Sequence, residues 1–551
     1  MKKLRGNISY NGISTKNCIS TKIEEWIDLR KFKKVRYLLF LAISVLVLQA
    51  CSTGGKSDSK DKDPVKGDDA SEGGTLTVVR LSDATGLDPH FITDIPSANI
   101  IHGKVYETLV QFDKDMEIQP MLAKEWKQPD SLTWEFTLEE GITFHDGSPF
   151  NATAVKKTLD RLLDPETGSP QMSKIGMVTE VVVVDETHVT LKLSEPYAPL
   201  LSILASQESS ILSPKVIDET PEELATSPVG TGPFVFDSWK SGQEIILKKN
   251  EKYWGTPVKI DQVVFKVVPE DATRLAMIEQ GEAHISDQVP VTEIERIENS
   301  DDLNLYRTDG LAVEYVGFNT SIAPFDDVRI RQAVSHAVER QAILTGVYND
   351  VGTLANVAMS PMVFGYSKDV KAYDYDITKA KELIKDAGLA DGTTVKLLTS
   401  DRKERINMAE VIQSQLKGIG LTVEIEVLEY GSYIEKVDKG DHQMFIGGWG
   451  NATGDGDYNQ YNLFHTDSIG SPGNHFYYSN KEVDTMIEQG RAEMDPEKRK
   501  EIYETVMQVE MDDAVYIPIR NYELLAVSNN DVKDYWLSAS NYLMLNDATV
   551  K

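Results

Sequence analysis

The chain has 551 residues, of which 41% are hydrophobic and 26% charged, and it carries a formal net charge of −30. This composition excludes a collagen-like or wholly disordered polymer, and the length is enough for roughly two to four structural units. The 37 Gly and 22 Pro are spread along the sequence and favour many turns between short elements over a bundle of long helices. The negative charge repels phosphate backbones and argues against a nucleic-acid partner.

The first 50 residues differ from the remainder in charge, because they hold ten Lys or Arg against three acidic residues. A basic flank at 30–36 precedes Tyr37–Ala50, a mostly apolar run of 14 residues. A membrane span needs about 20 residues, so the pattern predicts a secretory signal peptide over 1–50. The stretch ahead of the apolar run is longer than usual, and we expect translation to start downstream of Met1.

Cys51 follows this run directly, and Leu48-Gln-Ala-Cys51 resembles the lipobox of bacterial lipoproteins. The resemblance implies that Cys51 becomes the lipid-modified first residue of the mature chain and holds it at a membrane surface. The alternative is a soluble secreted protein. The other cysteine, Cys18, lies in the predicted leader, so we expect no disulfide in the exported body. Residues 51–74, rich in Ser, Gly, Lys and Asp, predict a flexible tether.

Short β-rich segments dominate from residue 75 onward for about 230 residues. The strand candidates are Thr75–Val79, Trp134–Leu138, Ile245–Lys248 and Val263–Val268, together with a hairpin of Glu180–Val184 and Val189–Leu193 joined by Asp185–His188. Within this region Asp271 is predicted to cap a helix that ends at Gly281.

After about Asn319, helices with a 3.6-residue period alternate with single strands, which is typical of an α/β unit. The expected helices are one running from Val328 to Ile343, Ile377–Ala387 closed by Gly388, Met408–Leu416, Lys481–Glu493 and Pro496–Met511. The expected strands are Thr422–Val427, Met444–Ile446 and Tyr516–Ile519, followed by an irregular tail with β character. No internal repeat of fixed period is present.

Catalytic signatures are missing from the chain, which lacks G-x-S-x-G, H-E-x-x-H, C-x-x-C and a full phosphate-loop motif. The nine histidines are dispersed, and His465 with His475 is the nearest approach to a metal pair. Because neither has the spacing of metal ligands, we expect no metal site and no cofactor. These observations argue against a secreted hydrolase.

The segment after Gly447-Gly-Trp-Gly450 is the strongest candidate for ligand binding. It presents Asp455 and Asp457 beyond the end of a predicted strand, where open α/β sheets bind ligands. A carboxylate there would pair with a ligand amine, and Trp449 would supply an apolar wall. The segment begins like a calcium loop but lacks the later Gly and Glu. The alternative interpretation is a plain surface turn.

Five further motifs follow one another in a fixed order along the chain. They are Thr143-Phe-His-Asp-Gly-Ser-Pro-Phe150 with Ala152 and Val155, Gly230-Thr-Gly-Pro233, Tyr253-Trp-Gly255, Val328-Arg-Ile-Arg-Gln-Ala333 and Lys379–Gly388. Together they resemble the peptide/nickel family (family 5) of ABC-transporter solute-binding proteins, over roughly Leu76 to Tyr542. Ala154 stands where that family usually has Asp. Phe144–Gly147 is interpreted as a turn with a buried Phe, and Gly230–Pro233 as a tight backbone crossing.

The resemblance implies an α/β fold of the periplasmic-binding-protein type (cluster C). Such a fold has two lobes, an extra subdomain in the first lobe and a hinge between the lobes. The expected boundaries are lobe I at 75–312 with the subdomain at about 106–225, lobe II at 313–520, and a C-terminal return to lobe I at 521–551.

The resemblance also implies a function. The protein would be an extracytoplasmic, lipid-anchored, monomeric receptor and no enzyme. It would capture a di- or tripeptide between its lobes, with glutathione as one candidate, and deliver it to an ABC permease. The alternatives are a nickel, metal-chelate or haem binder of the same fold and, from another class, a secreted hydrolase.

The resemblance also implies roles for individual residues. Peptide binders of the family hold the ligand ammonium with an Asp on the loop after a Trp-containing strand end, which points first to Asp457 and then to Asp455. Binders of short peptides place an Arg just before the helix that here runs through Met408, and this Arg meets the ligand carboxylate. Arg405 and Arg402 both stand near that position.

Overall fold

The computed structural model describes residues 73–471 and 473–551. The predicted signal peptide, Cys51 and nearly all of the predicted tether lie outside the described residues. Within the described ranges, no helix combines the length and the apolar character that crossing a bilayer requires.

An 11-stranded mixed sheet runs through the described residues in the order β15-β14-β16-β12-β17-β11-β1-β10-β9-β8, with β13 paired to β17. Its strands are β1 (Thr75–Arg80), β8 (Phe234–Lys240), β9 (Glu244–Lys249), β10 (Gln262–Val267), β11 (Ile285–Ser286), β12 (Leu303–Phe318), β13 (Thr353–Leu354), β14 (Thr393–Ser400), β15 (Leu421–Leu428), β16 (Met444–Gly450) and β17 (Tyr516–Asn529).

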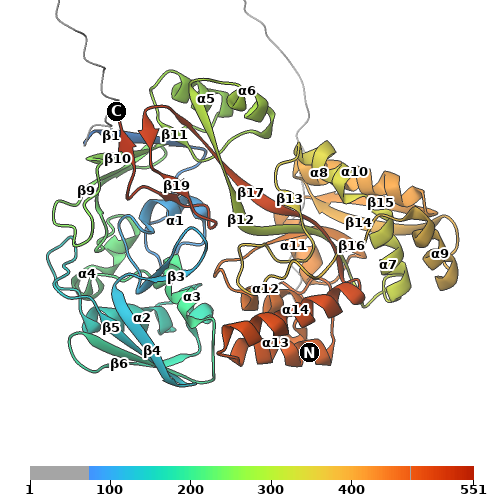
Figure 1. The fold of residues 1–551 in the computed structure, drawn as a ribbon, viewed down its shortest axis with the longest axis horizontal. Helices are drawn as coiled ribbons and strands as arrows, with labels where there is room; N and C mark the ends of the chain where they lie inside the picture. The colour runs from blue at the N-terminus through green and yellow to red at the C-terminus, as the bar shows by residue number, and fades with distance from the viewer. Residues whose placement is uncertain (1–72, 472) are drawn as a thin grey trace, which may run out of the picture. The chain divides into compact units, whose positions relative to one another are not determined.

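The long strands β12 and β17 run antiparallel and change partners along their length (Figure 1). The first part of β12 pairs with the end of β17, which also pairs with β11. The last part of β12 pairs with β16 and with the start of β17. The register shifts between Asp309 and Val313, which marks a bulge at the change of partners. The predicted lobe boundary at 312 falls beside this shift, and it stays a prediction.

A second, four-stranded antiparallel sheet with the order β4-β5-β7-β6 forms before β8. Its strands are β4 (Ala123–Asp130), β5 (Thr133–Leu138), β6 (Val178–Val183) and β7 (His188–Leu193), and helix α2 (Ala152–Leu163) packs on it. The predicted β6–β7 hairpin is confirmed. Two-stranded pairs are formed by β2 (Val110–Phe112) with β3 (Ile118–Pro120), β18 (Val532–Lys533) with β21 (Thr549–Val550), and β19 (Trp536–Leu537) with β20 (Leu543–Met544).

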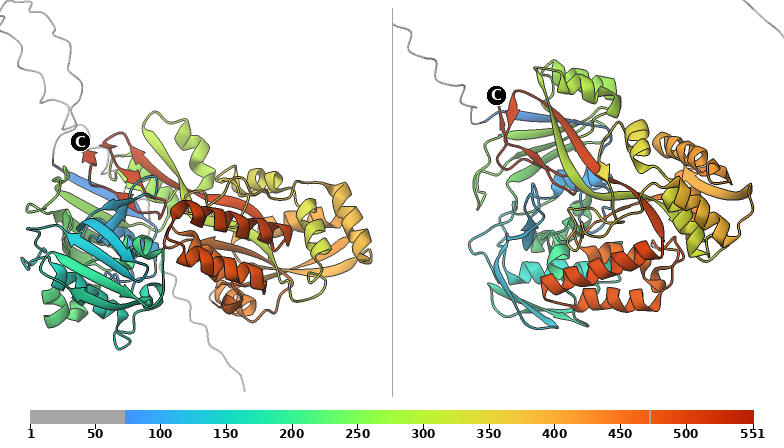
Figure 2. Two further views of the ribbon diagram at one scale, coloured as in Figure 1. Left: turned by 60° about the horizontal axis from the view of Figure 1, so that its bottom comes forward. Right: turned by 45° about the vertical axis from the view of Figure 1, so that its right-hand side comes forward.

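The other helices lie mainly after β12, and Figure 2 shows the last two, α13 and α14, packed side by side. Their bounds are α1 (Ile95–Ile101), α3 (Leu200–Leu204), α4 (Pro214–Glu219), α5 (Asp271–Glu279), α6 (Ile294–Glu298), α7 (Val328–Ala337), α8 (Arg340–Tyr348), α9 (Ile377–Ala387), α10 (Lys403–Lys417), α11 (Tyr430–Asp438), α12 (Gly456–Phe464), α13 (Lys481–Ala492) and α14 (Pro496–Asp512). Short 3-10 turns occupy Met172–Ile175, Gln207–Ser209, Pro221–Ala225, Val291–Glu293 and Thr466–Ser468.

Strand β16 shows why an unbroken apolar run marks the middle of the sheet. Met444 and Ile446 belong to one buried cluster, whereas Phe445 between them belongs to another. Successive residues of a strand point to opposite faces, so β16 is covered by core on both sides. This places the segment after β16 at the end of a rigid, buried strand.

Three of the predicted helices differ from the observed ones. The helix predicted over Met408–Leu416 is α10, which begins five residues earlier, so Arg405 lies inside the helix and not before it. The helix predicted from Val328 to Ile343 is broken, because Val338 leaves helical geometry at φ −91° and ψ 111° and a new helix begins at Arg340. Asp271 is the first residue of α5 rather than its cap, a position that Glu270 holds.

Two of the family motifs are structural, as predicted. A Cβ atom on Gly230 would lie 2.0 Å from the Val105 carbonyl oxygen, and one on Gly232 would lie 2.3 Å from that of Lys104. Only glycine allows this crossing of two backbones. Phe144 is buried, and Gly147 turns the chain with a φ of +82°.

Candidate ligand-binding site

Two neighbouring cavities are each lined by residues that precede β12 in the sequence and by residues that follow it. The larger cavity has a volume of about 500 Å³ and is bounded by residues between 112 and 202 on one side and by 361–366, 454–455 and 494–500 on the other. Ligand pockets of small molecules have about this size. The smaller cavity, of about 50 Å³, is lined by residues between 102 and 121, 205–207, 536–544 and Ala452. Phe112 and Met116 line both cavities.

The turn between β2 and β3 brings one side of this site against the other. Asp113 holds the turn by accepting hydrogen bonds from the backbone N–H groups of Asp115 and Glu117. Met116 at the turn has a φ of +62°, an uncommon backbone for a residue with a side chain. A Cβ atom on Gly454 would lie 2.7 Å from the Met116 thioether methyl. The two sides therefore touch at Gly454, whose φ of +74° itself favours glycine.

Asp455 is buried and is held by Arg499. Two nitrogens of the Arg499 guanidinium donate to the two carboxylate oxygens, both at 2.7 Å, and the two side chains are 3% and 5% exposed. A third nitrogen, Nε, donates to the Gly490 carbonyl at 2.7 Å. Asp455 also caps α12, because its carboxylate accepts a hydrogen bond from the Asp457 N–H. This carboxylate fixes the end of the 451–455 segment.

Asp457 is paired in the same way with Arg491, whose nitrogens donate to its two oxygens at 3.0 and 3.1 Å. Burial raises the pKa of Asp457, and the Arg491 charge opposes that rise. The Arg491 guanidinium lies 3.8 Å from the Tyr461 ring centroid, and the Arg491 carbonyl accepts a hydrogen bond from the Ala198 N–H. Arg491 therefore connects Asp457 to the far side of the site.

The segment that carries these two aspartates differs from its predicted form. It is predicted to be a loop, but residues from Gly456 onward form helix α12. The sequence Gly-Asp-Tyr-Asn-Gln-Tyr-Asn contains few good helix formers, so the helix propensity of its residues does not predict a helix. The Asp455 cap and packing against α13 hold the helix.

Trp449 lies at the end of β16 with its ring against Tyr458, at 5.4 Å between ring centroids. Its Nε1 is buried without a hydrogen-bond partner in the described part of the chain. A Cβ atom on Gly473 would lie 2.9 Å from the Trp449 ring. The indole therefore packs beneath α12, and it is not among the residues that line the two cavities.

Arg405 and Arg402 have different surroundings. Arg405 is buried and donates at 3.1 Å to Glu314 on β12, which also accepts a hydrogen bond at 3.1 Å from Arg520 on β17. Arg402 is exposed just before α10, and its guanidinium lies 5.8 Å from the Tyr430 ring centroid. In the described ranges no ion pair involves Arg402. Of the two predicted arginines, Arg402 is the one whose charge is not already neutralised by a carboxylate, and neither arginine is among the residues that line the two cavities.

The two histidines considered as a metal pair have separate partners. His465 faces Glu488 at 3.4 Å, and His475 is bonded to Asp438 at 2.8 Å. Within the described ranges, no group of three or more His, Cys, Asp or Glu side chains is arranged to hold a metal ion.

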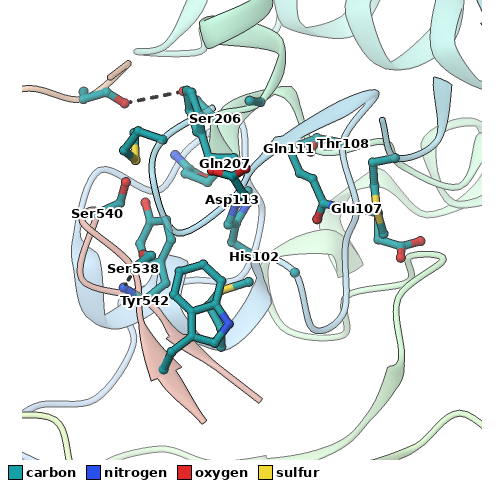
Figure 3. A pocket seen from close by; sticks show the side chains of 18 residues that line it. His102, Glu107, Thr108, Gln111, Asp113, Ser206, Gln207, Ser538, Ser540 and Tyr542 are labelled. Atoms are coloured by element: carbon teal, nitrogen blue, oxygen red, sulfur yellow. Dashed lines mark hydrogen bonds between the residues drawn. The ribbon is translucent and has the colours of Figure 1, made fainter. Parts of the chain in front are cut away.

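Sequence reasoning missed the residues around the smaller cavity. Figure 3 shows His102, Glu107, Asp113, Gln207 and Tyr542 projecting from segments that are far apart in the chain. Glu107 accepts hydrogen bonds from three side chains, and burial nevertheless raises its pKa to about 6. No short motif joins these residues, so only the folded chain brings them together.

The comparison with known proteins identifies the family. Residues 117–471 match the profile of the bacterial extracellular solute-binding proteins, family 5. The chain belongs to this family. The dipeptide-binding protein of Escherichia coli K12 is 31% identical to the chain over 490 residues, which cover 84% of this chain and 92% of that protein. The glutathione-binding protein GsiB of Salmonella typhi is 28% identical over 482 residues, covering 85% and 93%.

A solved structure supports the same assignment. The family 5 chain resembles the ABC transporter-associated periplasmic binding protein DppA from Helicobacter pylori, solved in complex with the peptide STSA. The TM-score is 0.72 at 28% identity, over 87% of this chain and 98% of that one. The predicted two-lobed α/β fold is confirmed, as is the family of extracytoplasmic solute-binding proteins of ABC importers.

Proposed function

We propose that the protein captures short peptides between its two lobes and passes them to the permease of an ABC importer. The observation that carries this proposal is the cavity of about 500 Å³ lined from both sides. Its lining includes Phe112, Trp134 and Phe364 together with charged side chains, a mixture that suits a zwitterionic ligand with apolar side chains. Named relatives bind a dipeptide, glutathione or a peptide.

Capture is coupled to closure of the lobes. Strands β12 and β17 link the two halves of the sheet, and the bulge near Asp309 is the place where they bend most easily. A ligand that contacts both sides only in the closed form shifts the equilibrium toward that form. No bond of the ligand is made or broken, and the protein acts as a lipid-anchored monomer held through Cys51.

The ligand carboxylate is assigned to Arg402. Arg405 is neutralised by Glu314, whereas the Arg402 guanidinium is exposed at the start of α10, just beyond the carboxyl end of β14. Asp455 and Asp457 are assigned to a positioning role, because Arg499 and Arg491 occupy their carboxylates. Trp449 supports the same segment from below.

A calorimetric titration with di- and tripeptides, including glutathione, tests the proposal. We expect saturable binding and unchanged peptide recovered afterwards. Ser202 lines the larger cavity from α3, so Ser202→Trp fills it and should weaken binding at least tenfold, about 1.4 kcal/mol. Thr485→Trp on the exposed face of α13 is the matched control and should bind like the wild type. Titrations without heat across a broad peptide set, or hydrolysed peptide, would contradict the proposal.

Replacing Arg402 tests the assignment of the ligand carboxylate. A hydrogen bond to a charged group contributes about 1.5–3 kcal/mol, so Arg402→Gln should weaken binding of a free peptide tenfold or more. The same peptide with an amidated C-terminus should bind the variant and the wild type alike. Arg296→Gln, at an exposed Arg of α6, serves as the control. Equal losses for both peptides would show that Arg402 does not meet the carboxylate.

Replacing Cys51 tests the membrane anchor. Cys51→Ser removes the thiol that would carry the lipid, so the protein should appear in the medium and lose fatty-acid labelling. Retention of the variant at the membrane would count against the anchor and leave the peptide proposal untouched.

A small metal chelate is the second candidate ligand, whereas haem is larger than the smaller cavity of about 50 Å³. One observation favours it: His102, Met116, Met121 and Met544 all line the smaller cavity. Imidazole and thioether groups bind soft metals, whereas the larger cavity offers carboxylates and cations. Titration of the protein with a nickel salt and with a small nickel chelate, in parallel with peptides, separates the two candidates.

A further inference from the structure

Met116 stands between the two cavities of the candidate site. Its side chain and that of Phe112 are half-buried and contribute to the lining of both cavities. On the opposite side, the segment after β16 contributes Ala452 to the smaller cavity and Gly454 to the larger one. The wall between the cavities therefore has two faces, one made of these two side chains and the other of the segment 452–454.

The two faces of this wall are in direct contact. A Cβ atom on Gly454 would lie 2.7 Å from the Met116 thioether methyl and 3.1 Å from the Phe112 ring. Met116 packs against a hydrophobic cluster drawn from 311–539, whereas Phe112 packs against a cluster drawn from 109–211. Met116 is thus the residue through which the turn between β2 and β3 joins the core of the opposite side.

The side chain of Met116 is suited to a barrier that can move. Methionine is unbranched and has three rotatable bonds, so it adapts to its surroundings. Strands β2 and β3 pair only with each other, and an isolated two-stranded hairpin has little stability of its own. The backbone of the turn is nevertheless held, because Asp113 accepts hydrogen bonds from the N–H groups of Asp115 and Glu117 and from the Gln119 amide. The thioether can therefore change rotamer while the turn keeps its shape.

The sizes of the two cavities show what this wall separates. The larger cavity, of about 500 Å³, has the volume of a small-molecule pocket. The smaller cavity has about 50 Å³, and a single water requires roughly 10–15 Å³, so it accepts only a few atoms. A peptide in the larger cavity ends where Met116 meets Gly454. One more residue on that side would have to displace the thioether and break its contact with the opposite side.

We propose that Met116 closes one end of the larger cavity and thereby limits the length of the peptide that binds. This assignment rests on the proposed capture of peptides, and it goes beyond that capture by naming a residue that selects the ligand by length. Removal of the thioether joins the two cavities and makes room for one further small residue.

A calorimetric series of alanine peptides with two to five residues, on the full chain, tests the assignment. The affinity of the wild type should fall at least tenfold at one step in length. Met116→Gly should move this fall to a peptide one residue longer, and its turn should persist because glycine readily adopts the φ of +62° found at this position. Met116→Phe should admit no longer peptide than the wild type does.

Met362→Ala is the matched control. Met362 lines the larger cavity and is not among the residues that line the smaller one, so the variant also removes a thioether from the larger cavity but leaves the wall intact. The fall in affinity should stay at the length seen for the wild type. Met116→Ala, which keeps a Cβ atom in the turn, should show the same shift as Met116→Gly and decides the outcome if Met116→Gly is poorly folded.

The outcomes separate length selection from a structural role and from the peptide proposal itself. If the wild type binds all lengths alike, or if the fall stays at the same length without the Met116 thioether, the assignment is overturned while peptide capture stands. Weaker binding of every length to the same degree also overturns it, because that result shows only a lost contact between the two sides. If no peptide of any length binds, both proposals are overturned.

Discussion

We expect Asp455→Asn to lower the free energy of unfolding by about 3 to 5 kcal/mol, the cost of breaking a buried ion pair by removing one partner. The variant leaves the Arg499 guanidinium buried and without its bidentate acceptor. It also weakens the cap of α12. Urea denaturation at neutral pH, followed by intrinsic fluorescence, measures the change.

The same variant separates a structural role from a ligand contact. If Asp455 bound the ligand, Asp455→Asn would remove affinity and leave stability almost unchanged. Asp455→Asn with Arg499→Met removes both charges and should recover much of the lost stability, since apolar replacements of buried pairs are often neutral. Glu435→Gln, in the exposed pair with Lys439, is the control and should leave the free energy of unfolding almost unchanged, because exposed ion pairs contribute little.

The local sequence was enough to predict the secondary-structure elements that carry their own start and stop signals. Helix α9 is observed from Ile377 to Ala387 as predicted, because Asp376 caps its start and Gly388 ends it with a φ of +73°. Strand β17 was predicted only over its first four residues, but it extends to Asn529. Pairing with β12 and β11 sustains that extension, and such pairing is a property of the fold rather than of the local sequence.

The candidate site could be predicted only in part, for a related reason. The sequence marked the segment after β16, and this segment does border both cavities through Ala452 and Asp455. It could not reveal that Asp455 and Asp457 are neutralised by arginines 44 and 34 residues away. A carboxylate near a ligand cleft can bind the ligand only if it is not already paired with a buried cation. Whether it is paired depends on tertiary contacts, which the local sequence does not show.

We expect a second large effect from His90, which should make the stability of the protein depend on pH. This side chain is fully buried, and burial together with the charge of Arg161 lowers its pKa to about 3. Arg161 donates to the imidazole Nδ1 at 2.7 Å and also pairs with Asp88. The folded protein therefore keeps His90 neutral at a pH where the unfolded chain, with a pKa near 6.5, binds a proton.

The direction in which pH changes the stability follows from this difference in pKa between the folded and unfolded states. The contribution of His90 to stability is complete above pH 6.5 and falls as the pH decreases toward 3, because protons stabilise the unfolded state. At pH 5 the loss is about 2 kcal/mol relative to neutral pH. Buried carboxyl groups with raised pKa values, such as Glu107, act in the opposite direction, so the total pH profile does not isolate His90.

The difference in unfolding free energy between the wild type and His90→Gln does isolate the contribution of His90, because the contributions of the other titratable groups cancel. We expect the stability advantage of the wild type over the variant to shrink by about 2 kcal/mol between pH 7 and pH 5, measured by urea denaturation at each pH. His188→Gln is the control, since that side chain is 49% exposed and meets water in both states. An advantage that stays constant over this range would show that His90 is protonated inside the folded protein.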